Sequence, residues 1–289
     1  MSKFVHGDNI ARKEKAKKTT RTQHKLLEEI RVEYEKWKSA NLELKGPFFT
    51  KSESDTTILE ERVRLMNVYK DFIDQKVYAE AFDSRSNLHS TVLEEFIYYL
   101  FKDLVSDISN NAIIGKSHAY KDIFYQSTSF KSMITEPSFK IEKKDHDFII
   151  GVNIDAKFRC KGETKEQKEK LEIPAVAIEC KTYLDKTMLE EVSTAGSQLL
   201  IINPNAKYFV VAERLKLTDA VNLKKHKVDQ IFILRKMKNT DREYRLQDDY
   251  ENKPIFPDVV ENLFNAVREH LSQEWNGSTS ISLESGMLL

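Results

Sequence analysis

Apolar residues recur at helical spacing in two long segments near the start of the chain. In the first segment these positions are Leu26, Leu27, Ile30, Tyr34 and Trp37, and the helix is expected to end before GPFF at 46–49. In the second, over about residues 56–80, they are Leu59, Val63, Met66, Tyr69, Ile73 and Val77. The pattern therefore predicts a helical region ahead of the rest of the fold.

The pattern changes near residue 90. A helix is predicted over 91–105, followed by a short strand over 143–151 that ends at a glycine turn. The segment 159–172 mixes five positive with four negative residues and predicts a solvated excursion between strands. A further strand over 174–184 precedes a helix over 186–202, at whose start Thr187 and Glu190 have capping-box spacing.

Two more strands, over 207–217 and 230–238, and a last helix over 258–274 complete the prediction. A helix that joins two strands favours a parallel crossover, so the chain is expected to be an α/β (mixed α+β) protein. Its core would be a central mixed sheet flanked by helices. We predict a basic N-terminal arm at 1–24, a helical region at 25–88, a core at 89–275, and a polar tail at 276–289.

Composition narrows the class of protein. The 289 residues are 40% hydrophobic and 32% charged, and no apolar run is long enough to cross a membrane. No signal-peptide pattern opens the chain, so a cytoplasmic protein is expected. Two cysteines argue against a disulfide framework and a cysteine-based zinc site.

The net charge is zero, but the first 25 residues carry eight Lys or Arg against Asp8 and Glu14. Such a segment can neutralise DNA phosphates, or it is simply a solvated terminus.

The strand PAVAIECKTYL, residues 174–184, carries two charges inside an apolar run. Because strand side chains alternate between faces, Val176, Ile178 and Cys180 are predicted to point into the core. The opposite face carries Ala175, Ala177, Glu179 and Lys181. Both charges thus fall on one face, near the end of the strand, where a cleft is expected.

Asp147 lies on the preceding predicted strand. Two carboxylates on neighbouring strands, Asp147 and Glu179, suit Mg²⁺, which prefers oxygen ligands and keeps several waters. A bound metal lowers the pKa of a water and neutralises charge on a phosphate, while a lysine such as Lys181 stabilises that charge. The backbone carbonyl of Cys180 is a further candidate ligand.

Asp147 with Glu179-Cys180-Lys181 resembles the Asp…Glu-x-Lys signature of the PD-(D/E)xK nucleases. The stretches KDHDFIIG, PAVAIECKTYL and YFVVAERLKL resemble those of the heterodimeric type II restriction endonucleases typified by BbvCI. LEEFIYYLF and the basic N-terminal stretch are also similar. The resemblance covers about 90–235 well and the helical start loosely.

The resemblance implies a Mg²⁺-dependent endonuclease subunit that pairs with a related second subunit at a short, asymmetric site in duplex DNA. Each subunit would cut one strand, leaving 5′-phosphate and 3′-hydroxyl ends. Asp147 and Glu179 would be metal ligands and Lys181 the catalytic lysine. A glutamate on the first core helix often assists the metal in this superfamily, and Glu94, between Leu93 and Ile97, fits that pattern.

Several alternatives stay open. Asp145 competes with Asp147, and His146 between them is expected to face the other way. Glu95 competes with Glu94, whose capping-box spacing from Thr91 offers a structural explanation. Lys143 and Lys144 are either DNA-backbone contacts or solvated lysines. A repair or recombination nuclease with the same core, and a non-catalytic DNA-binding or partner-binding module, are the competing functions.

Overall fold

A computed structural model describes residues 2–82, 88–239 and 253–275. The first helices are α1 (Val5–Glu14), α2 (Arg21–Glu43), α3 (Asp55–Ile73) and α4 (Lys76–Ala81). The helix predicted over 56–80 is thus two helices. Part of the predicted basic arm forms α1, in which His6, Gly7, Asn9 and Ile10 are buried. The predicted tail at 276–289 lies outside the described residues.

The second part of the chain alternates helices with the strands of one five-stranded sheet. Its elements are α5 (Ser90–Ile108), β1 (Ala112–Tyr125), α6 (Phe130–Thr135), β2 (Phe139–Arg159), β3 (Glu166–Leu184), α7 (Lys186–Ile202), β4 (Lys207–Leu215), the 3₁₀ turn η2 (Leu223–Lys225), β5 (Gln230–Ile233) and α8 (Pro257–Ser272). The strands lie in chain order. β1–β2 and β2–β3 are antiparallel, whereas β3–β4 and β4–β5 are parallel. The predicted mixed sheet flanked by helices, with a parallel crossover through α7, is confirmed.

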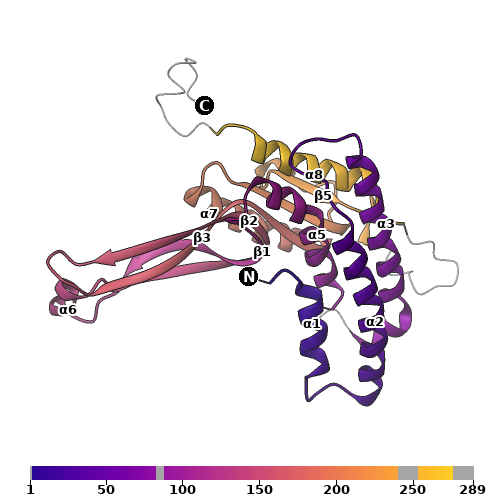
Figure 1. The fold of residues 1–289 in the computed structure, drawn as a ribbon, viewed down its shortest axis with the longest axis horizontal. Helices are drawn as coiled ribbons and strands as arrows, with labels where there is room; N and C mark the ends of the chain where they lie inside the picture. Colours follow the sequence, from indigo (N-terminus) through magenta and orange to yellow (C-terminus); the bar gives the residue numbers. More distant parts are fainter. Residues whose placement is uncertain (1, 83–87, 240–252, 276–289) are drawn as a thin grey trace.

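In the body of the protein, helices cover both faces of the sheet (Figure 1). On one face Phe148, Val176 and Ile178 join the helical core around α5 and α8. On the other, Ile149 and Ala177 pack with α7. The predicted alternation in β3 is correct: Val176, Ile178 and Cys180 are buried on the α5 side. The capping box predicted at Thr187 is wrong, because the side chain of Asp185 caps α7 by accepting from the backbone of Met188.

The sequence prediction missed β1, most of the length of β2 and the first part of β3, residues 166–173. The predicted excursion at 159–172 is wrong, since residues 166–172 belong to β3. The long parts of these strands, residues 117–146 and 152–173, project from the body with α6 at the tip, and we call this projection the β-arm (Figure 1). Ser117, Ala119 and His146 are buried at its base. Most of its other side chains are exposed or half-buried and form no core, so no apolar pattern marks it.

β2 bends sharply and runs both into and out of the body. A straight strand of its length would span about 65 Å, yet the rings of Phe139 and Phe158 near its two ends lie 4.5 Å apart. The register of β2 against β3 shifts between Ile150 and Gly151, at the predicted glycine turn. At Gly151 a Cβ would lie 2.2 Å from the carbonyl oxygen of Ile173, so only glycine permits this approach. The strand therefore continues past the glycine instead of ending there.

A buried ion network ties the N-terminal helices to the sheet. Glu213 of β4 is fully buried. Its carboxylate lies 3.0 Å from Lys70 Nζ of α3 and 3.0 Å from Arg235 Nε, just after β5. Lys70 also pairs with Asp74 at 3.1 Å. Because charges buried without partners are costly, this network fixes how α3 sits on the sheet.

Candidate active site

A β-bulge places Asp147 at the centre of the site. Between the pairs Gly115–Ile149 and Ser117–His146, β1 advances by two residues and β2 by three. Lys116 of β1 thus lies opposite Asp147 and its neighbour Phe148. Bulges of this kind re-aim side chains and are frequent beside active sites.

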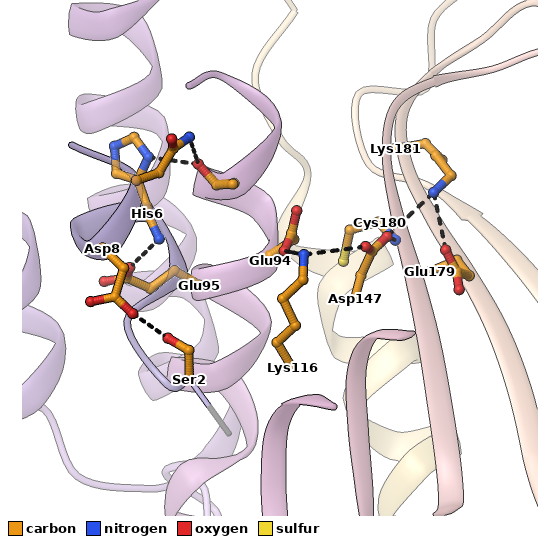
Figure 2. A network of polar contacts seen from close by, with 12 residues as sticks. Ser2, His6, Asp8, Glu94, Glu95, Lys116, Asp147, Glu179, Cys180 and Lys181 are labelled. Carbon is orange, nitrogen blue, oxygen red and sulfur yellow. Dashed lines mark hydrogen bonds and ion pairs between the residues drawn. The ribbon is translucent and has the colours of Figure 1, made fainter. Parts of the chain in front are cut away.

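Asp147 is joined to β3 by hydrogen bonds. Its Oδ2 accepts from the backbone N–H of Cys180 at 3.0 Å and lies 3.3 Å from Lys181 Nζ. Lys181 Nζ is also 3.0 Å from Glu179 Oε2. Lys181 therefore lies between the two carboxylates, as Figure 2 shows, and the structure brings the three residues of the predicted motif together.

The two carboxylates have opposite electrostatic character. Burial and the negative charge of Glu179 raise the pKa of Asp147. Burial alone would raise the pKa of Glu179, but contacts with His146 and Lys181 outweigh it and hold that pKa at about 2. Burial works against the charge of Lys181, yet Asp147 and Glu179 raise its pKa overall. The surroundings therefore favour the ion pair of Glu179 and Lys181, whereas they disfavour the negative charge of Asp147.

Glu94 of α5 also belongs to this site. Its Oε2 lies 2.9 Å from Lys116 Nζ, which is 3.9 Å from Asp147 Oδ1 (Figure 2). Burial and the charge of Asp147 raise the pKa of Glu94 to about 7. The suggested capping box with Thr91 is wrong, since α5 begins at Ser90 and His89 is its N-cap. The buried position of Glu94 therefore has no capping role.

Glu95, the competing glutamate, faces a different part of the protein. It is fully buried. Its four partners are the backbone N–H groups of His6 (2.8 Å) and Gly7 (3.1 Å) and the hydroxyls of Tyr34 (3.0 Å) and Tyr99 (2.5 Å). Its hydrogen bonds thus hold α1 and α2 against α5. The geometry favours Glu94 over Glu95 as the glutamate of the site.

The other candidates lie nearby. Asp145 is exposed and pairs with His118 on the β-arm. Lys143 and Lys144 lie on the same stretch of β2 and have no ion-pair partner within the described ranges. His146 is buried, with Nδ1 3.4 Å from Glu179 Oε1. It faces the carboxylate because the bulge shifts the alternation of β2.

Two residues of the site, Lys116 and Tyr208, were not predicted from the sequence. Lys116 follows Gly115 in a strand that was not predicted, and only the bulge directs it toward Asp147. Tyr208 of β4 donates its hydroxyl hydrogen to Glu179 Oε1 at 3.0 Å. A signal for Tyr208 was available, because it lies near the start of the strand that the predicted parallel crossover joins to the strand of Glu179. Lys116 left no comparable signal.

The donor set fits a hard divalent ion. Across residues 2–82, 88–239 and 253–275, no three His, Cys, Asp or Glu side chains are grouped so that they could hold a metal. Mg²⁺ does not need such a cage, because it is commonly held by one or two carboxylates with waters completing its shell. Burial, and after it the charge of Glu179, raises the pKa of Asp147, and a cation bound between the two carboxylates would offset both effects.

A mixed sheet flanked by helices, with Asp147 on one strand and Glu-x-Lys on the next, is the arrangement of a PD-(D/E)xK nuclease. The family model of the Bpu10I restriction endonuclease matches residues 85–288, and the chain belongs to that family. The prediction of a restriction endonuclease, with duplex DNA as substrate, is confirmed.

Comparison with solved structures supports the same fold. The structure described as "native BbvCI A2B2 tetramer at low resolution" superposes with a TM-score of 0.68 at 16% identity. The match covers 93% of this chain and 96% of that chain. No curated protein matches the chain. Among the helices of the described ranges, none combines the length and apolar character needed to span a membrane.

Proposed function

We propose that this chain hydrolyses one strand of duplex DNA at a short, asymmetric site, with Mg²⁺ as cofactor, leaving 5′-phosphate and 3′-hydroxyl ends. The observation that carries this proposal is the convergence of Asp147, Glu179 and Lys181 on two neighbouring strands. Family membership supports the reaction class. The acid pair and its lysine support the choice of metal-assisted hydrolysis.

Asp147 and Glu179 would hold the ion, with the backbone carbonyl of Cys180 as a further ligand. When bound, Mg²⁺ supplies a Lewis acid that lowers the pKa of a water and neutralises charge on the phosphate. Lys181 orients the attacking water and stabilises the developing negative charge. The backbone N–H of Cys180 fixes the Asp147 carboxylate at 3.0 Å, so this ligand is positioned before the ion arrives. Glu94, on α5, would assist these residues in holding the ion.

We further propose that the working enzyme contains a second, related nuclease subunit. An asymmetric DNA site needs an asymmetric reader, because a two-fold homodimer presents the same surface twice. The similar BbvCI structure is described as an A2B2 tetramer, which contains two kinds of subunit. In this assembly each subunit would cut one strand.

The remaining assignments follow from the DNA substrate. Residues 89–275 would form the nuclease core, and 25–88 a region for DNA recognition or subunit contact. Lys143 and Lys144, which lie beside Asp147 on β2, would contact the DNA backbone. An enzyme that cleaves DNA acts where the DNA is, so we propose a cytoplasmic location.

The test is cleavage of a long plasmid or viral DNA by the purified chain mixed with its partner subunit. With Mg²⁺ we expect discrete fragments whose mapped ends carry 5′-phosphates. With Ca²⁺ we expect binding to DNA without cleavage, and with EDTA no cleavage. Fragments formed in EDTA would overturn the metal mechanism, and absence of cleavage with Mg²⁺ and the partner would overturn the proposal.

A further inference from the structure

Lys116 occupies a position that the Asp…Glu-x-Lys motif does not account for. It lies on β1 where β2 bulges, opposite Asp147, and its Nζ is 2.9 Å from Glu94 Oε2 and 3.9 Å from Asp147 Oδ1. Lys181 contacts the other oxygen of the same aspartate, Oδ2, at 3.3 Å. Two lysines from different strands therefore flank Asp147 (Figure 2).

The side chain of Lys116 is accessible as well as paired. It is 40% exposed, against 26% for Lys181 and 8% for Glu94. Its ammonium group thus lies between the buried carboxylates and the solvent from which DNA must approach. A lysine with a structural role alone would be expected to lie as deep as its partner.

The backbone of Lys116 is held by the N-terminus. Its N–H donates to the carbonyl oxygen of Ser2 at 3.2 Å, in an isolated antiparallel bridge. Ser2 in turn donates its hydroxyl hydrogen to Asp8 of α1 at 2.5 Å. Glu95 holds the same helix through the N–H groups of His6 and Gly7. The position of Lys116 is therefore fixed from both sides of the strand.

The charges of the site show what this lysine adds. Counted as ionised, Glu94, Asp147 and Glu179 carry three negative charges, and Lys116 and Lys181 carry two positive charges. One divalent ion would bring the total to one positive charge, which matches a single phosphodiester group. Without Lys116 the loaded site would carry one positive charge fewer, and its attraction for that group would be weaker.

We propose that Lys116 is a second cationic group of the active site that contacts a phosphate oxygen of the bound DNA, beside Lys181. The inference rests on the proposed nuclease function and deepens it, because it assigns a substrate-contacting residue outside the motif. In the absence of DNA, Glu94 holds the ammonium group at the edge of the site. On binding, the flexible lysine stem lets it reach the phosphate while staying close to Asp147.

The test is the salt dependence of DNA binding. The assembled enzyme, containing this chain and its partner subunit, is titrated in Ca²⁺ against a duplex oligonucleotide that carries the mapped cleavage site. Each phosphate contact by a lysine contributes about 0.9 to the slope of log affinity against log salt concentration. For Lys116→Met we expect binding that is several-fold weaker at low salt and a slope that is shallower by about 0.9. Lys116→Arg should restore the slope.

Lys207→Met is the matched control. Lys207, at the start of β4, is as exposed as Lys116 (40%), but its partner is Asp229 rather than a carboxylate of the site, so its removal should leave the slope unchanged. The double variant Lys116→Met with Glu94→Gln removes both partners together and avoids an unpaired buried carboxylate if the single variant unfolds. It should show the same shallower slope.

An unchanged slope in folded Lys116→Met, or in the double variant, would overturn the inference, even if the melting temperature falls. An equal change in Lys207→Met would do the same. If the unsubstituted enzyme cleaves its site normally in Mg²⁺, such a result removes the role of Lys116 alone. If it neither binds in Ca²⁺ nor cleaves in Mg²⁺, the proposed function fails, and this inference fails with it.

Discussion

Glu94 and Glu95 are adjacent in α5 but point into different networks. Glu94 reaches Lys116 and the edge of the candidate active site. Glu95 accepts four hydrogen bonds that fasten the N-terminal helices. One turn of α5 thus contacts both the candidate active site and the N-terminal helices. Substitution of Glu94 should therefore affect mainly cleavage, and substitution of Glu95 mainly stability.

We expect Glu95→Ala to unfold the protein more easily without a direct effect on chemistry. It leaves buried donors without an acceptor, at a cost of at least about 3 kcal/mol. Glu94→Gln should leave the free energy of unfolding unchanged or slightly higher. The reason is that burial and Asp147 raise the pKa of Glu94 to about 7, which makes its charge unfavourable. Urea unfolding measures the stability of the two variants, and cleavage rates measure their activity. In folded protein, cleavage should fall at least tenfold for Glu94→Gln but not for Glu95→Ala.

Lys181→Ala should convert the assembled enzyme into a nicking enzyme. Lys181 is the cation shared by Asp147 and Glu179. In the proposed assembly the partner subunit would keep its own active site and would still cut the other strand. Supercoiled plasmid should become open circles and not linear molecules. Lys186→Ala is the control, because Lys186 is exposed at the start of α7. This variant should still yield linear DNA. Full double-strand cleavage by Lys181→Ala would contradict the assignment.

The buried network at Glu213 should make stability depend on pH. Burial would raise its pKa, but the charges of Lys70 and Arg235 outweigh this and hold the pKa at about 2. Because the folded pKa lies below the unfolded value, this stabilisation is present above about pH 4.5 and is lost as the pH falls toward 2. The difference in unfolding midpoint between the natural protein and Glu213→Gln should therefore be large at pH 7 and shrink below pH 4.5.

Glu191→Gln provides the comparison for this measurement. Glu191 is exposed on α7, so its removal should leave the midpoint nearly unchanged at every pH. A difference for Glu213→Gln that stays constant from pH 7 to pH 3 would show that the network does not depend on the charge of this carboxylate.

Gly151→Ala should disrupt the bend of β2. The added Cβ would lie 2.2 Å from Ile173 O and 2.9 Å from Pro174 Cα, both backbone atoms that cannot move aside cheaply. We expect a loss of several kcal/mol in unfolding free energy. Gly162→Ala, where φ is +86° but no atom lies within 4 Å, should cost only about 1 kcal/mol. Equal losses in the two variants would argue against the close contact.

The sequence allowed most of the body to be predicted, because its helices and core strands bury apolar side chains at regular spacing. The faces of Val176 and Glu179 followed from alternation alone. The β-arm could not be predicted in the same way, because its strands are solvated and carry mixed charges along their length. The place of Lys116 depends on a register shift between two strands, and no local pattern in the sequence encodes it.

The bend in β2 separates the β-arm from the part of the strand that carries the candidate active site. β2 enters the body just before Asp147 and leaves it just after Gly151, so the pairs that hold the site are complete before the β-arm begins on either side. The connections at the tip, 126–138 and 160–165, can gain or lose residues without moving any of those pairs. Relatives can therefore evolve β-arms of different length around an unchanged active site.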